Sequence, residues 1–191
     1  MGVNNPPISS SSSASAVIPS WPMKSGYYYS PNFSRGAGTA TLSQGELRAA
    51  LIGVQSAVTV DRIACEVTTA GTTGAVIRLG IYNVGADGFP TTLVLDAGTV
   101  TATTTGVKEI TVSQALTAGN YCLAACTQGA PATAPQVRIH FLSSSVPQPT
   151  GSTYQRSCFT QYAVTGALPA TYITTPGIDT GDMPHVQVRI A

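Results

Sequence analysis

From about residue 45 onward, the chain contains short segments in which apolar residues recur at every second position. In RIACEV the apolar face is Ile63, Cys65 and Val67. A period of two puts these side chains on one face of a β-strand, where they can be buried. The same pattern in AVIRLGIYN, VRIHF and VQVRI predicts buried positions at Ala75, Ile77, Leu79, Ile81, Val137, Ile139, Phe141, Val186, Val188 and Ile190. The predicted outward positions are Val76, Arg78, Gly80, Tyr82, Arg138 and His140.

Two segments differ from this alternation. NYCLAAC, residues 120–126, has no polar alternation, which predicts a central strand covered on both faces. SQGELRAAL, residues 43–51, is the one helix candidate, with Ser43 as its N-cap. Turns rich in Gly, Pro and Thr separate the strand segments.

About eight short strands at this spacing predict an all-β fold, an antiparallel β-sandwich or jelly roll. The last strand ends at Ala191 and is expected to pair inside a sheet. Residues 1–20 are rich in Ser and Pro and predict a flexible attachment tail. Residues 21–191 are then one β-sandwich knob domain, with a long loop insertion at 150–177.

Composition narrows the classes of partner. Only 9% of the 191 residues are charged, against about 25% in typical domains, and the net charge is +1. Nucleic acid is not an expected partner, because binding phosphates needs clustered Lys and Arg. No apolar run reaches the length of about 18 residues that spans a membrane, and the N-terminus lacks the pattern of a secretory signal.

The chain is therefore expected to be made in a reducing cytosol, where cysteine thiols usually stay reduced. The four cysteines are Cys65, Cys122, Cys126 and Cys158. Free buried thiols are favoured over two disulfides, which stay open as the alternative.

The stretch WPMKSGYYYSPNFSRG, residues 21–36, opens the predicted domain. Adjacent residues of an extended chain point to opposite faces, so Tyr27 and Tyr29 share a face and Tyr28 takes the other. The three rings cannot form one flat platform. We predict that they lock the start of the sandwich, with sugar stacking as the alternative. The residues predicted for attachment and for the start of the domain are Ile8, Val17, Ile18, Trp21, Tyr27, Tyr28 and Tyr29.

A second group of aromatic residues lies in the 150–177 insertion and comprises Tyr154, Phe159, Tyr162 and Tyr172. Long loops on a rigid sandwich commonly carry binding specificity. This group is the predicted binding surface.

Candidate catalytic and metal-binding residues each have a simpler explanation as part of a turn. GIDTGD contains the Asp-Thr-Gly triplet of aspartic proteases, but that chemistry needs two facing carboxylates. Asp179, Asp182 and His185 could hold a cation, and Asp87 in GADGF could hold calcium; turns are the favoured interpretation.

Residues of other enzyme classes are also weighed. Cys122 and Cys126 lie within one strand, where no turn brings both thiolates to a zinc ion. His140 and His185 have no nucleophile in a recognisable elbow. We predict no enzyme, no cofactor and no metal site.

Several motifs together resemble a known module. VDRIACEVTTAGTTGAVIRLGIYN, LVLDAGTV and TTGVKEITVSQALTAGNYCLAACTQGAP, with GYYYSP before them, resemble a β-sandwich module of tailed-phage virion proteins. The module recurs in phages of actinobacteria, in proteins labelled minor tail, fibre or head-associated. The resemblance covers roughly residues 26–142. The family places Trp where Cys122 stands and an aliphatic residue where Cys126 stands, so both cysteines are expected to act as small buried hydrophobes.

The resemblance implies a bacteriophage virion structural protein, made in the host cytoplasm and located in the virion. It would be a capsid fibre or decoration protein, or a tail-fibre-like knob, anchored by its N-terminal tail. Expected partners are other virion proteins, with a homo-oligomer, for which a trimer is a candidate. The alternative is a module of the tail tip that binds host-surface glycans. A hydrolase of cell-wall polymers is a third class, which no group of residues supports.

Overall fold

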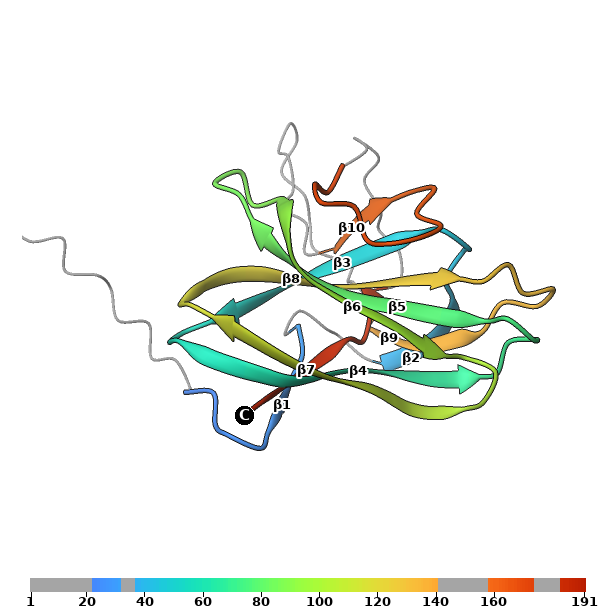
Figure 1. The fold of residues 1–191 in the computed structure, drawn as a ribbon, viewed down its shortest axis with the longest axis horizontal. Coiled ribbons are helices and arrows are strands. Elements are labelled where there is room, and N and C mark those ends of the chain that lie inside the picture. The colour runs from blue at the N-terminus through green and yellow to red at the C-terminus, as the bar shows by residue number, and fades with distance from the viewer. Residues whose placement is uncertain (1–21, 32–36, 141–157, 174–182) are drawn as a thin grey trace, which may run out of the picture.

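The computed structural model describes residues 22–31, 37–140, 158–173 and 183–191. This part of the chain is all-β, with two antiparallel sheets stacked face to face (Figure 1). The predicted fold class is confirmed. The predicted tail lies outside the described residues, as do Ile8, Val17, Ile18, Trp21, Phe141 and Tyr154.

The first sheet has seven strands in the described residues. Its main path is β1 (Tyr28–Tyr29), β12 (Gln187–Ile190), β4 (Val58–Thr69), β9 (Gln136–His140) and β11 (Met183–Pro184), with β2 (Ala37–Thr41) paired to β9 and β7 (Gly106–Leu116) paired to β4. The second sheet runs in the order β10 (Cys158–Gln161), β3 (Leu47–Val54), β8 (Gly119–Gln128), β5 (Val76–Val84) and β6 (Pro90–Thr101). The strand number exceeds the prediction of about eight because the structure adds very short strands such as β1 and β11.

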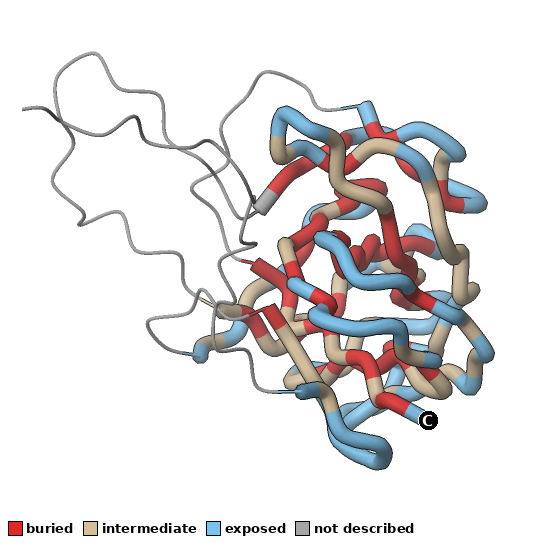
Figure 2. Tube along the Cα trace, turned by 90° about the vertical axis from the view of Figure 1, so that its left-hand side faces the viewer, coloured by how far each residue is buried: buried red, intermediate tan, exposed pale blue. Residues whose placement is uncertain are grey.

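The space between the sheets holds the main hydrophobic core. The predicted inward residues of β4, β5, β9 and β12 all belong to it, among them Ile63, Ile77 and Ile139 with no exposed surface. Figure 2 shows the buried segments running through the body, with the exposed ones at turns and edges. The period-two interpretation of these strands is confirmed. The closing strand β12 also pairs inside its sheet as predicted, between β1 and β4.

The central strand β8 is buried from Tyr121 to Gln128, as its lack of polar alternation predicts. Leu123 and Ala125 face the main core, whereas Cys122 and Cys126 belong to a second cluster on the outer side of the five-stranded sheet. Cys65 and Cys126 are free buried thiols, which confirms the expectation for these two. Burial raises the pKa of each to about 12, so both are protonated at neutral pH. The side chain of Cys158 lies outside the described part.

The helix prediction for residues 43–51 is wrong, because Leu47–Val54 forms strand β3. This strand lies between β8 and β10 and pairs along its whole length with β8. Its alternate residues enter different clusters, with Leu47 and Ala49 on the outer side and Ile52 and Val54 in the main core. Burial on both faces suits a central strand, and these tertiary contacts outweigh the helix propensity of Leu and Ala.

Gly80 and Tyr82 on β5 lie on the outer face of the five-stranded sheet, as the alternation predicts, but both are buried there. Residues 162–173, which we call the covering segment, follow β10 and cover this part of the five-stranded sheet. Leu168 packs over Gly80, and the Tyr82 hydroxyl donates to the carbonyl oxygen of Pro169 at 2.9 Å. Part of the predicted loop insertion is therefore a sheet strand followed by a covering segment.

Candidate functional site

The tyrosines at the start of the domain fasten it to its last strand. Tyr28 and Tyr29 form β1, which pairs with Arg189 and Val188 of β12. Gly26, in a turn with φ of 81°, donates its amide to the carbonyl oxygen of Ile190 at 2.8 Å. The first described residues and the last strand are therefore held in one sheet.

The three tyrosine side chains lie in different environments. Tyr29 packs against the core, and its hydroxyl accepts a hydrogen bond from the amide of Lys24 at 2.7 Å. The Tyr28 hydroxyl donates to the Glu109 carboxylate on β7. Tyr27 is 62% exposed. They do not form one platform, and of the three rings that of Tyr27 is the most exposed.

The outer face of the seven-stranded sheet carries paired charges. The Arg189 and Asp61 side chains form an ion pair at 2.6 Å. The guanidinium of Arg138 pairs with Glu66 at 2.8 Å. Hydrogen bonds from these arginines lower the pKa values of Asp61 and Glu66. Ion pairs at such accessible positions add little stability, so their main effect is to make this face polar.

The outer side of the five-stranded sheet carries the described aromatic residues of the predicted binding group. Tyr82 and Tyr172 meet edge to face, with ring centroids 5.1 Å apart. The Tyr172 hydroxyl lies 2.9 Å from the carbonyl oxygen of Leu47 and 2.8 Å from that of Phe159. Phe159 and Tyr172 are buried, which removes them from the predicted binding surface and makes them part of the second core cluster.

Tyr162 is the described member of the predicted binding group that reaches solvent, with 60% of its surface exposed. Two residues absent from that prediction are exposed nearby along the same side, Phe89 at 42% and Ile173 at 65%. The Phe89 ring packs against the Phe159 ring, with their centroids 5.3 Å apart. The Ile173 amide donates a hydrogen bond to the side-chain oxygen of Gln161 at 3.0 Å. We call Phe89, Tyr162 and Ile173 the exposed apolar rim.

Phe89 reaches this rim from the turn between β5 and β6. The Asp87 carboxylate accepts the Phe89 amide at 3.1 Å, and the Gly85 amide donates to the Phe89 carbonyl oxygen at 2.8 Å. This contact agrees with the interpretation of Asp87 as a turn residue. The signal that could have identified Phe89 is an aromatic residue directly after the turn sequence Asp-Gly.

Asp96, in the Asp-Ala-Gly triplet of LDAGT, lies within β6 and has a structural role. Its carboxylate forms a two-pronged ion pair with Arg78, with Nε–Oδ1 and Nη2–Oδ2 both 2.8 Å. It also accepts the amide of Leu168 at 3.0 Å. Although partial burial opposes ionisation, these donors lower the pKa of Asp96 below its ordinary value. The group stays ionised and holds the covering segment on the sheet.

The other candidate chemistry falls on residues with different surroundings or outside the described part. Asp179 and Asp182, and with them the Asp-Thr-Gly triplet, lie outside the described residues. His185 stands beside His140, with ring centroids 4.2 Å apart. Within the described ranges, no three His, Cys, Asp or Glu side chains are grouped to hold a metal ion. The same ranges contain no helix that is long and apolar enough to cross a membrane.

Comparison with known proteins adds no family. No protein-family model matches the sequence, and no curated protein matches it. Among solved structures, a chain of the T13 viral particle of infectious bursal disease virus is similar at 18% identity and a TM-score of 0.31, over 60% of this chain and 27% of that one. A structure of the Gx strain of infectious bursal disease virus is similar at 16% identity and a TM-score of 0.34, over 86% of this chain and 36% of that one. The chain therefore spans between 27% and 36% of the length of these viral chains.

Proposed function

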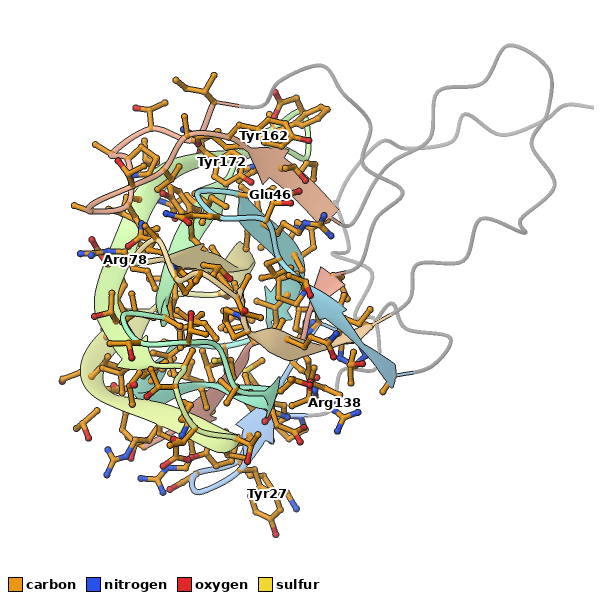
Figure 3. The ribbon with its side chains drawn as sticks, turned by 90° about the vertical axis from the view of Figure 1, so that its right-hand side faces the viewer. Tyr27, Glu46, Arg78, Arg138, Tyr162 and Tyr172 are labelled. Carbon is orange, nitrogen blue, oxygen red and sulfur yellow. The ribbon has the colours of Figure 1, made fainter. Side chains whose placement is uncertain are left out.

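We propose that the chain is a structural protein of a bacteriophage virion, in which the sandwich is a knob and the N-terminal segment attaches it to the particle. The sequence resemblance over roughly residues 26–142 supports the phage assignment. The observation that carries the proposal is the placement of the two ends of the knob. Tyr27, where the chain joins the sandwich, and Tyr162, on the exposed apolar rim, lie on opposite sides of the molecule (Figure 3).

This arrangement suits a projecting part. The strand β1 fixes the start of the domain to β12, so a load applied through the N-terminus passes into the seven-stranded sheet. The exposed apolar rim then faces away from the attachment side. We place the knob on a capsid fibre or decoration protein, with a tail-fibre-like knob as the alternative. The partners are other virion proteins, and a homo-oligomer such as a trimer would group several knobs.

Deletion of residues 2–20 tests the attachment. We expect the truncated protein to keep the thermal unfolding midpoint of the full chain, because β1 and everything after it remain, and to be absent from purified particles. The matched control replaces residues 9–13, the serine run, with an equal number of glycines and keeps Ile8, Val17 and Ile18. Incorporation of the truncated protein at the level of the full chain would refute the attachment role.

A second function, binding of a host-surface glycan, is favoured by the exposed apolar rim. Aromatic rings such as those of Phe89 and Tyr162 offer apolar area for stacking against a sugar. The test is a glycan array, followed by whole-cell binding, with Phe89→Ala and Tyr162→Ala. Tyr27→Ala is the matched control, since Tyr27 is equally exposed on the opposite side. Binding that the rim variants reduce at least tenfold and the control leaves unchanged supports this function; equal binding by all variants counts against it.

A further inference from the structure

Two histidines that are 45 positions apart in the sequence meet at one corner of the seven-stranded sheet. His140 ends β9, and His185 follows directly after β11. Their ring centroids are 4.2 Å apart and their planes are inclined by 61°. We call them the histidine pair. They are the only two histidines of the chain.

The ring nitrogens of the histidine pair make few hydrogen bonds with the described residues. Both ring nitrogens of His140 are buried, and neither has a hydrogen-bond partner among the described residues. One ring nitrogen of His185, Nε2, lies 3.2 Å from the side-chain nitrogen of Gln187. A buried polar group without a partner is uncommon and points to a site where a change of state has structural consequences.

Among the described residues, the charged groups around the histidine pair come from β4 and β9. The Glu66 carboxylate favours a proton on His185, whereas the Arg138 guanidinium opposes it. Glu66 and Arg138 form an ion pair with each other, and they act on His185 only through the electrostatic interaction between charges. The neighbouring strands β2 and β11, with sequences AGTAT and MP, bring no titratable side chain. Gln187 is the polar neighbour on β12.

The surroundings keep both rings neutral at pH 7. Burial lowers the pKa of His140, and burial together with the neighbouring His140 ring lowers the pKa of His185 to about 4. An unfolded chain has histidine pKa values near about 6.5. Between about pH 6.5 and about pH 4 the unfolded state therefore binds more protons than the folded state, and stability falls as the pH falls. The effect is complete below the folded pKa values.

We propose that the histidine pair makes this corner of the sandwich sensitive to acid, and that protonation releases β11 and His185 from β9. Two cations cannot share the observed separation without repulsion, and one ring must move. The segment that would move, β11 with His185, makes only a short pairing with β9 among the described strands. Met183 pairs with His140, and the His185 amide donates to the carbonyl oxygen of Arg138 at 2.9 Å. Loss of these pairs opens the sheet locally and leaves β4 and β8 intact.

Proton NMR titration of the full chain is the first test, because two ring signals are expected and both belong to the histidine pair. We expect both midpoints below the ordinary histidine value of about 6.5, and a slow or broadened titration as the corner opens. Hydrogen exchange at the same pH values should show loss of protection at the His185 amide before the amides of β8. Midpoints near 6.5 for both rings, with the His185 amide still protected at pH 5, would overturn the proposal.

Variants separate the histidine pair from other titrating groups. His140→Asn and His185→Gln replace each ring by a neutral amide, and the double variant removes both titrations. Between pH 7 and 5 we expect the unfolding midpoint of the natural chain to fall by about 3 °C or more, and that of the double variant to stay nearly level. The window avoids carboxylates, whose ordinary pKa values are near about 4. Tyr28→Phe, on the same sheet face, is the control and should keep the natural slope. An equal fall in the double variant would contradict the proposal.

Discussion

At the scale of single residues, Tyr172 shows how one side chain holds the covering segment. Its ring stands edge to face with Tyr82, and its hydroxyl lies between the carbonyl oxygens of Leu47 and Phe159. These two oxygens belong to the paired strands β3 and β10. Tyr172 therefore joins the end of the covering segment to β10, the strand that precedes it, and to β3.

The change Tyr172→Phe keeps the ring and removes the hydroxyl from this buried position. We expect a loss of about 1–2 kcal/mol in the free energy of unfolding, because buried carbonyl oxygens lose a donor. Urea unfolding followed by circular dichroism measures it. Tyr162→Phe is the matched control, since its hydroxyl is on an exposed side chain, and it should change the free energy by less than about 0.5 kcal/mol. Equal effects of the two changes would refute the structural role of the Tyr172 hydroxyl.

At the scale of elements, β7 is a long strand that pairs only with β4 among the described strands. No described strand pairs with its other edge, and an open edge invites pairing with another chain. Lys108 lies opposite Cys65, a core residue, so the lysine is on the face that looks toward the other sheet. Its amino group donates to the Thr104 hydroxyl at 2.7 Å. A lysine on the inner face of an edge strand disfavours pairing, since a second strand would bury its charge.

The change Lys108→Val therefore tests whether this edge is protected. We expect the Lys108→Val protein to self-associate at concentrations at which the molecular mass of the natural chain stays constant. The reason is that the inner face of β7 then carries no charge at position 108 to oppose pairing of its edge. Light scattering after size-exclusion chromatography measures the change. Thr111→Val adds the same side chain on the outer face of β7, opposite Arg62, and serves as the control. Unchanged size of the Lys108→Val protein over a hundredfold concentration range would argue against a protective role.

At the scale of the whole molecule, the two outer faces of the sandwich differ. The seven-stranded sheet presents ion pairs such as Arg189–Asp61, whereas the five-stranded sheet is covered by residues 162–173. At Gly80 the covering segment lies close to β5, because a Cβ atom there would collide with Leu168; it would also lie 2.6 Å from the carbonyl oxygen of Leu95 on β6. The covering segment needs this glycine to lie flat on β5.

The change Gly80→Ala should therefore displace the covering segment. We expect a loss of about 1–3 kcal/mol in the free energy of unfolding, typical of overpacking, and faster proteolysis within residues 158–173. Urea unfolding and limited proteolysis with mass spectrometry measure the two effects. Gly166→Ala, in the same segment but with open space around its Cβ, is the control and should have little effect. Resistance of the Gly80→Ala protein equal to that of the control would show that the contact is not limiting.

The alternation of residues by itself determined the sandwich. The inward faces of β4 and β12, with Ile63 and Val188, follow from a period of two, and the double burial of β8 follows from its unbroken apolar run. These are local properties, because a strand must put every second side chain on one side. A chain of this composition then has one way to bury those faces, which is against each other.

Only the tertiary structure decided which outer positions are covered and which residues meet. Tyr82 and Tyr172 are far apart in the sequence, and whether each is exposed depends on where residues 158–173 fold back. The helix candidate became β3 because β8 and β10 offered edges on both sides. The histidine pair likewise exists only because β9 and β11 are neighbours. Contacts between distant segments depend on sheet order, and periodicity along the chain carries no information about that order.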